Sequence, residues 1–304
     1  MSRDGEKAKK HGFAIAGKLR KHGFAIAIII PGTIFLVGFF VMILASTLQI
    51  AFTYDGIFPA LGSFKQMSEM TDFWASLKRT ILFVVVGTPL QLGAGLLLAL
   101  LVWKPFRGRG IVRSAFILPV AITAVVTATI LHTLTSDFGH INELLLGGYS
   151  WFPQLISTPI DFRGSEIAAL GISLLGKTWR DMPISMLIIL AGLESIGDDQ
   201  YEAAETLGAG SLQKFRYITL PLLIPAISTV LTLRSIECWK EFIFPFFLAP
   251  SFPLLSTLID YAYHTLYSPG VACAIALVLV ILIIATMGIL NWVLKKLRIA
   301  LIKI

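Results

Sequence analysis

Charged residues are scarce in this chain. Lys, Arg, Asp and Glu make up 14% of its 304 residues, whereas a soluble domain carries about 25%. Hydrophobic residues make up 56% of the chain, and its mean hydropathy is +0.81. This composition excludes an ordinary soluble domain, so we expect an integral membrane protein.

The sequence also lacks the alternating apolar and polar pattern of membrane β-strands. Apolar runs of about 20 residues recur instead, which is the length that a helix needs to cross a hydrocarbon core of about 30 Å. Because only helices and closed barrels satisfy their backbone groups in lipid, this pattern predicts an all-α, polytopic bundle. Only two cysteines are present, Cys238 and Cys273, and we expect free thiols without a disulfide or zinc site.

Motifs for catalysis are missing too. The sequence has no Gly-rich phosphate loop ending in Lys-Ser or Lys-Thr, so this chain does not itself supply an ATPase. No Ser-His-Asp or paired-carboxylate arrangement stands out. The scattered His132, His140 and His264 are better explained as polar interface residues than as catalysts. We therefore expect no enzyme activity, no metal site and no cofactor bound by this chain.

Six apolar segments predict six membrane spans. They cover residues 23–51, 80–103, 114–135, 167–193, 220–248 and 271–294. The first is too long for a signal peptide and lacks a clear small-residue cleavage site, so we expect an uncleaved anchor. The fourth is interrupted by Lys177, Arg180, Asp181 and Pro183.

Basic residues determine the predicted orientation. They cluster in segment 1–22, in the loops after the second and fourth spans, and in segment 295–304. Positively charged loops stay in the cytoplasm, and six spans place all four segments there. We therefore predict a multi-pass protein of a bacterial or archaeal inner membrane. Segment 1–22 and the tail 295–304 are cytoplasmic, and residues 23–294 form one six-helix domain. The net charge of +7 comes from these flanking residues and does not indicate nucleic acid.

A near repeat lies in the N-terminal segment. The sequence of residues 10–16 recurs at residues 21–27, and a spacing of eleven is about three helical turns. The first copy is either an interfacial amphipathic helix or a chance duplication without function.

Residues 198–221 form an ordered polar stretch between the fourth and fifth spans. Asp198 or Asp199 is predicted to cap a short helix, with Glu202 in capping-box spacing. Gly208 suits the left-handed residue that ends a helix. A second short helix is expected from about Ser211, followed by the fifth span. These signals by themselves fit either a capped loop without a partner or a docking element.

The spacing within this stretch resembles the EAA loop of ABC importer permeases. It reads Glu202-Ala203-Ala204, three residues, Gly208, nine residues, Ile218, one residue, then Leu220-Pro221. Trp179, Pro183, 191–193 and Tyr201 are similar to the preceding span and loop of the binding-protein-dependent sugar permeases. The similarity covers about residues 80–290. Leu207 departs from the family, which often has Asp there.

This resemblance implies the permease subunit of a type I ABC importer that translocates a carbohydrate. It implies a second permease subunit, two ATPase subunits that use ATP and Mg, an extracytoplasmic solute-binding protein, and surrounding membrane lipid. The family's coupling helix, which docks on the ATPase, would be built here from Glu202, Ala203, Ala204, Glu205, Gly208, Leu212 and Phe215.

Ionisable residues inside the fourth and fifth spans are candidates for a substrate path. With the adjacent tryptophans, the candidates are Trp179, Arg180, Asp181, Glu237, Trp239, Lys240 and Glu241. Aromatic faces beside hydrogen-bonding groups suit a sugar. An equally weighted alternative is that these charges pair to hold the bundle, which is the preferred interpretation for Arg234. Lys240 and Arg180 are the better substrate candidates, and they would suit an acidic sugar or a glycerol-phosphate-type substrate.

Two other function classes are alternatives. An ion-coupled secondary transporter would use Asp181, Glu237 and Glu241 as relays, but no inverted repeat is visible and the capped loop would be unexplained. A membrane-embedded enzyme lacks any motif. A loop with Tyr261, Tyr263, His264 and Tyr267 either receives the binding protein or lies in the aromatic belt of the membrane.

Overall fold

The computed structural model describes the backbone of residues 3–302, and the side chains of residue 23 and of residues 27–296. Helices account for the regular structure of this described part, which contains an isolated bridge between Tyr54 and Ile57 but no named strand. The all-α prediction is confirmed. The predicted amphipathic face of residues 11–16 and most of the basic tail lie outside the described side chains.

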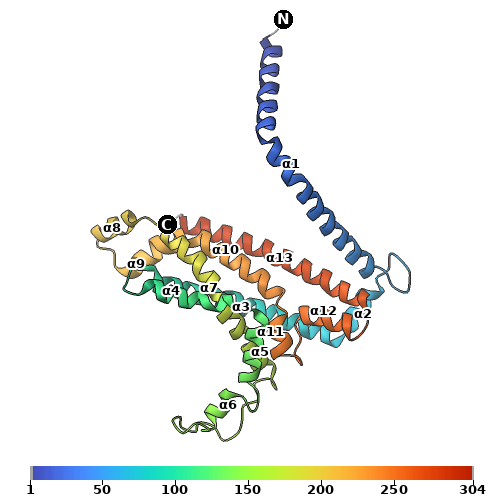
Figure 1. The fold of residues 1–304 in the computed structure, drawn as a ribbon, viewed down its shortest axis with the longest axis vertical. Helices are drawn as coiled ribbons and strands as arrows, with labels where there is room; N and C mark the ends of the chain where they lie inside the picture. The colour runs from blue at the N-terminus through green and yellow to red at the C-terminus, as the bar shows by residue number, and fades with distance from the viewer. Residues whose placement is uncertain (1–2, 303–304) are drawn as a thin grey trace.

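The first helix, α1 (Arg3–Ala51), extends away from the rest of the molecule (Figure 1). It runs without interruption through the predicted boundary at residues 22 and 23. Its apolar side chains are largely exposed from Ile28 onward, including Phe35 at 68%. Such a surface is incompatible with water over this length, and it fits the lipid environment predicted for the first span.

Three helices form the centre of the bundle: α3 (Thr71–Trp103), α7 (Glu166–Glu194) and α10 (Leu220–Trp239). Helix α3 lies along α7, and α10 packs against both. The approach of α3 to α7 is close, because a Cβ added at Gly95 would lie 2.4 Å from the Cβ of Ser185. Helix α13 (Pro269–Ile302) covers α10 and also contacts α12 (Leu255–His264) and α2 (Gly62–Glu69).

Two predicted spans are broken in the structure. The third consists of α4 (Arg109–Ala121) and α5 (Ala124–Leu134), which are bent by 91°. Pro119 lies in the last turn of α4, and the side chain of Thr123 caps α5. The fifth ends at Trp239, and a separate helix, α11 (Ile243–Leu248), follows. Each of these two predicted spans therefore consists of two helices rather than one continuous helix.

Four described stretches are long and apolar enough to cross a membrane: Ala27–Ala51, Thr71–Trp103, Ser211–Trp239 and Pro269–Lys296. The bent α4–α5 pair would be a fifth. Helix α7 is long enough but is not among these apolar stretches, because the charged residues Lys177, Arg180 and Asp181 lie in its middle. Six spans therefore remain a prediction.

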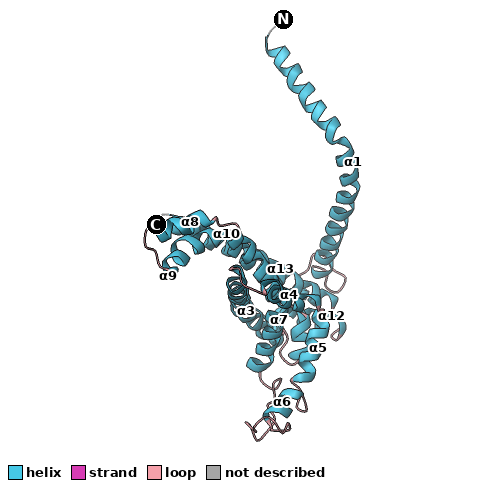
Figure 2. Ribbon diagram, turned by 60° about the vertical axis from the view of Figure 1, so that its left-hand side comes forward, coloured by secondary structure: helices cyan, strands magenta, loops and turns pink. Residues whose placement is uncertain are grey.

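The two ends of the bundle differ. Helices α8 (Asp198–Thr206) and α9 (Ser211–Lys214) lie at the same end as the C-terminal part of α13, whereas α12 and α2 lie at the other end of α13 (Figure 1). The short helix α6 (His140–Leu145) lies beyond α5, away from α8, which Figure 2 shows from a second direction.

Candidate functional site

Helix α8 begins at Asp198, so the residue that caps it lies before both predicted candidates, Asp198 and Asp199. Its N-cap is Gly197 in an extended conformation, without a side-chain cap hydrogen bond. The predicted capping by Asp198 or Asp199, with Glu202 completing a capping box, is therefore wrong. Both aspartates instead lie in the first turn, where the helix dipole favours negative charge.

The end of α8 follows the prediction for Gly208. Leu207 is the C-cap, and Gly208 has a left-handed φ of +79°. The N–H of Gly208 donates to the carbonyl of Glu205, and the N–H of Ala209 donates to that of Ala204, both at 2.9 Å. This is the hydrogen-bond pattern of a Schellman motif, which glycine adopts at the least conformational cost.

The second helix of the loop is not separate from the fifth span. Helix α9 passes into a π-helix, η1 (Phe215–Thr219), and η1 passes into α10 without a break. The expected independent second helix is therefore the first part of a continuous helical stretch. Pro221 lies at the start of α10, as predicted. A π-helical segment within an α-helix often marks a functional position.

The predicted coupling residues divide into an outer and an inner group. The outer group is exposed and consists of Glu202, Ala203, Glu205, Gly208 and Leu212, whereas Ala204 and Phe215 are half-buried. Leu212 is 79% exposed, and the neighbouring Leu207 is 88% exposed. Glu205 pairs with Lys214 across the Gly208 turn. The hydrogen bond and positive charge of Lys214 hold the pKa of the Glu205 carboxyl below its ordinary value.

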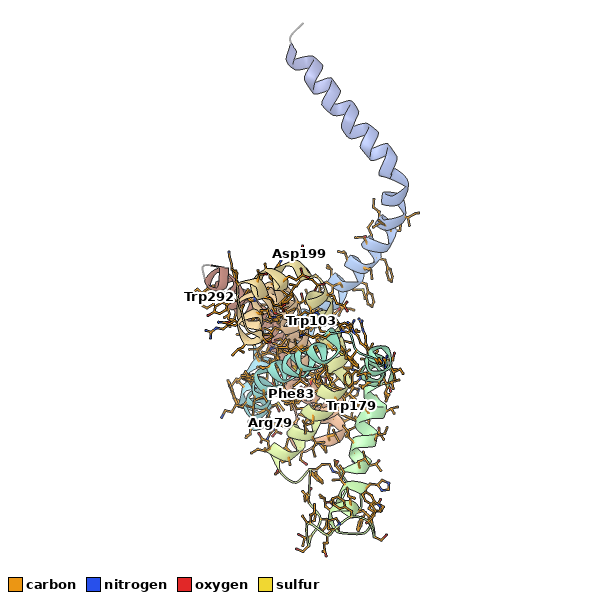
Figure 3. The ribbon with its side chains drawn as sticks, turned by 90° about the vertical axis from the view of Figure 1, so that its left-hand side faces the viewer. Arg79, Phe83, Trp103, Trp179, Asp199 and Trp292 are labelled. Atoms are coloured by element: carbon orange, nitrogen blue, oxygen red, sulfur yellow. The ribbon has the colours of Figure 1, made fainter. Side chains whose placement is uncertain are left out.

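Phe215 lines a cavity of about 660 Å³ between α8, the α9–η1 segment and the end of α3. Trp103 and Lys104 at the end of α3 and Tyr201 of α8 also line this cavity. Figure 3 shows Trp103 on the side of the bundle nearer to Asp199, with Phe83 and Trp179 farther away. Of the predicted coupling residues, Glu205 and Phe215 line this cavity, at the end of the bundle where α8 faces the end of α3.

The substrate-path candidates lie around a different centre, in the middle of α7. Lys177 Nζ lies 2.9 Å from Asp181 Oδ2 and 2.6 Å from Glu241 Oε2. Arg180 Nη1 lies 2.7 Å from Asp181 Oδ1. Lys177 and Asp181 are only 4% and 5% exposed, respectively. Buried charges are tolerated when they are paired and hydrogen-bonded in this way.

Arg234 and Glu237 complete this charge network. The Arg234 side chain is 1% exposed, and its Nη1 lies 2.6 Å from Glu237 Oε2 and 3.7 Å from Asp181 Oδ2. Three cations thus face three carboxylates, so the charge network has no net formal charge. Its members are Lys177, Arg180, Asp181, Arg234, Glu237 and Glu241.

The charge network also connects the two helix breaks. Arg180 Nε donates to the carbonyl of Ile122, between α4 and α5, at 3.4 Å. The carboxylate of Glu241, between α10 and α11, accepts from the N–H of Phe244 at 3.2 Å. Since Lys177 also pairs with Glu241, the charged middle of α7 contacts the chain at both breaks.

The remaining path candidates differ in exposure. Trp239 is 4% exposed and belongs to the apolar core. Trp179 is 44% exposed and lines an apolar cavity of about 590 Å³ between α5 and α7. Lys240 is exposed and takes part in no ion pair among the described residues.

The histidines have local polar partners: His132 contacts Arg163, His140 Nδ1 lies 2.9 Å from the Tyr149 hydroxyl, and His264 Nδ1 lies 2.9 Å from Asp260 Oδ1. Within residues 3–302 as described, His, Cys, Asp and Glu form no group of three or more that could hold a metal ion. Cys238 and Cys273 are free, as predicted.

The sequence indicates Lys177 as a charge inside the fourth span, and Tyr201 is part of the family resemblance, but neither is among the predicted site residues. Lys177 precedes Asp181 by four residues, and this helical spacing is a usable signal for an ion pair. The partner of Tyr201, Thr219, is 18 residues away and on another helix. No local pattern indicates that contact.

Comparison with known proteins matches residues 91–299 to the family described as "Binding-protein-dependent transport system inner membrane component". The probable ABC transporter permease protein y4oQ of Sinorhizobium fredii is 32% identical over 245 residues, covering 78% of this chain and 76% of that protein. The trehalose/maltose transport system permease protein MalF of Thermococcus litoralis is 27% identical over 242 residues, covering 78% of this chain and 80% of that protein.

A solved structure has the same fold. It is that of a bacterial ABC transporter involved in the import of the acidic polysaccharide alginate, and one of its chains superposes with a TM-score of 0.81 at 20% identity. The match covers 93% of this chain and 99% of that chain. The family match spans more than half of the sequence, and it includes α7, the α8–Gly208–α9 segment and both helix breaks. This chain therefore belongs to the family of inner membrane components of binding-protein-dependent transport systems.

Proposed function

We propose that this chain is the permease subunit of an ATP-driven importer, and that it translocates a carbohydrate delivered by an extracytoplasmic binding protein. The segment from α8 to α9 carries the proposal. It projects from one end of the bundle (Figure 1) and presents Leu207 and Leu212 to the surroundings at 88% and 79% exposure. Apolar side chains on a polar loop outside the spans are expected to be covered by another protein.

The partner that covers this segment is the ATPase subunit of the same transporter. Glu202, Ala203 and Leu212 form its contact surface in this proposal, and Gly208 sets the angle between α8 and α9. Glu205 acts within the loop by pairing with Lys214. The ATPase supplies the hydrolysis of ATP with Mg, and a second permease and the binding protein complete the assembly. The loop and both termini are cytoplasmic, in line with the distribution of basic residues.

The charge network bears on the class of carbohydrate. Arg180 is one of the two cations that would suit an acidic substrate, but Asp181 neutralises it at 2.7 Å. Lys240 remains as an exposed cation beside the α10–α11 break. The balance favours a neutral sugar, and the matched permeases named for trehalose and maltose support the same choice. Lys240→Gln should therefore leave uptake of the transported sugar near wild type, whereas selective loss of uptake of an anionic sugar would contradict a neutral substrate.

Uptake by vesicles containing the assembled transporter tests the main proposal. Wild type should take up sugar with ATP, and vanadate should stop it. Glu202→Lys and Gly208→Asp should insert normally but lose uptake, because they alter the contact surface and the left-handed turn. Gly197→Ser is the matched control, since Ser is favoured at an N-cap and Gly197 has ordinary backbone angles. Uptake that persists under vanadate, or normal uptake in both loop variants, would contradict the proposal.

A further inference from the structure

Helix α8 is joined to the bundle by few contacts. In the described part of the chain it has no buried residue and packs along no other helix. The cavity of about 660 Å³ separates its inner side from the end of α3 and from the α9–η1 segment. A force applied to α8 by a docked partner therefore cannot pass through a packed helix–helix interface.

Tyr201 crosses this cavity. Its ring centroid lies 5.5 Å from that of Trp103 on α3, with an angle of 54° between the planes. Its hydroxyl lies 3.0 Å from Thr219 Oγ1. One side chain thus connects α8 with the end of α3 and with the last residue of η1. The other described link of α8, between Glu205 and Lys214, reaches only α9 and stays within the loop.

Thr219 lies where the loop becomes a membrane helix. It is the last residue of the π-helix, it is 2% exposed, and α10 begins at the next residue. The Thr219 hydroxyl also donates to the carbonyl of Lys214 at 3.5 Å, so Thr219 contacts both ends of the π-helical segment η1. Single-turn π-helical segments inside α-helices often mark functional positions, and this one lies directly before α10.

We propose that Tyr201 is a positioning residue that acts as a strut between α8 and the junction of η1 with α10. This inference rests on the proposed function, in which α8 docks on an ATPase. When the ATPase moves α8, the ring contact of Tyr201 with Trp103 and its hydrogen bond to Thr219 transmit the movement. The start of α10 therefore moves with the loop. Without Tyr201, α8 still binds the ATPase. When α8 is displaced, however, it moves into the cavity and does not move α10.

The test is the number of sugar molecules transported per ATP hydrolysed by the complete transporter in vesicles, together with the amount of ATPase that co-purifies. Tyr201→Phe keeps the ring and removes the hydroxyl, and this ratio should fall about fivefold, as for the loss of one hydrogen bond. Tyr201→Leu removes both contacts, and the ratio should fall about thirtyfold. ATPase binding and hydrolysis should stay near wild type in both variants. Tyr217→Phe, which removes an exposed hydroxyl in the same segment, is the matched control.

A double variant separates a strut from general damage. Tyr201→Phe combined with Thr219→Val removes both hydroxyls, so neither is left buried without a partner. The fall in sugar transported per ATP should then be no larger than the fall in either single variant. Additive losses would overturn the proposal, as would an unchanged ratio in Tyr201→Leu. A fall in ATPase binding proportional to the fall in uptake would also overturn it, since Tyr201 would then only hold α8 folded. If wild type itself shows no ATP-driven uptake, the proposed function fails first.

Discussion

Removal of the Lys177 charge is the sharpest perturbation of the charge network. Lys177 is the cation between Asp181 and Glu241, at 2.9 and 2.6 Å, and its side chain is 4% exposed. Lys177→Met keeps most of the volume but leaves two cations facing three carboxylates. Removing one partner of a buried ion pair costs about 3–5 kcal/mol, and an effective dielectric constant of about 20 gives a similar value for one contact near 4 Å.

A second substitution tests whether charge balance is the cause. In Lys177→Met with Glu241→Gln, two cations face two carboxylates, and the amide carbonyl introduced by the second change can still accept from the N–H of Phe244. Most of the lost free energy of unfolding should return, because replacing a whole buried pair by uncharged groups is often close to neutral. A coupling of about 2–3 kcal/mol between the two sites is expected.

Unfolding of the purified transporter in mixed micelles, followed by the loss of helical signal, measures these differences. The matched control is Lys240→Met, which removes an exposed cation outside the network and should change the free energy of unfolding by at most about 0.5 kcal/mol. Wild-type stability in Lys177→Met, or strictly additive losses in the double variant, would refute the assignment of Lys177 to a structural network. Retained uptake in the double variant would place Lys177 outside the substrate path.

Local geometry gives three further predictions. Gly95→Ala should destabilise the protein by about 1–3 kcal/mol through overpacking against α7, whereas Gly93→Ala, whose Cβ would meet no described atom within 4 Å, should be neutral or slightly stabilising in the same unfolding assay. Gly208→Asn should retain more uptake than Gly208→Val, because Asn tolerates a positive φ and a β-branched residue does not, and equal uptake would contradict a role for the left-handed turn. The lowered pKa of Glu205 means that its pair with Lys214 contributes fully above the unfolded Glu value of about 4.3 and is lost only as pH falls through the lower folded value. Uptake should therefore respond to Glu205→Gln equally at about pH 6 and pH 8, and a difference between these pH values would contradict the pairing.

Local patterns predict the parts of the site that depend on neighbouring residues. Gly208 is expected to be left-handed because it ends a helix-forming stretch, and its φ is +79°. Pro221 is expected in the first turn of the fifth span because proline lacks an N–H that this turn would leave unpaired. It is the second residue of α10, which follows η1 directly. The predicted cap at Asp198 or Asp199 is wrong because Gly197 adopts the extended conformation first, and sequence preferences do not separate adjacent candidates.

The helix breaks could not be predicted from hydropathy. Residues 114–135 are largely apolar, so their hydropathy is the same for a straight helix and for the bend of 91° between α4 and α5. Residues of α7 contact both breaks: Arg180 contacts the Ile122 carbonyl, and Lys177 pairs with Glu241, 64 residues away. The sequence suggested that these charges either line a path or pair, and the structure shows the pairing.

The sequence by itself determined the class of this protein, because a low charge content, long apolar runs and asymmetric basic loops are properties of composition and order along the chain. It also located the segment that we propose to dock on the ATPase, since the spacing from Glu202 to Pro221 is local. Only the tertiary structure decided which charges meet, where the helices break, and that Tyr201 reaches Thr219 across a cavity. Those contacts join residues on different helices, and their geometry is set by how α3, α7 and α10 pack together.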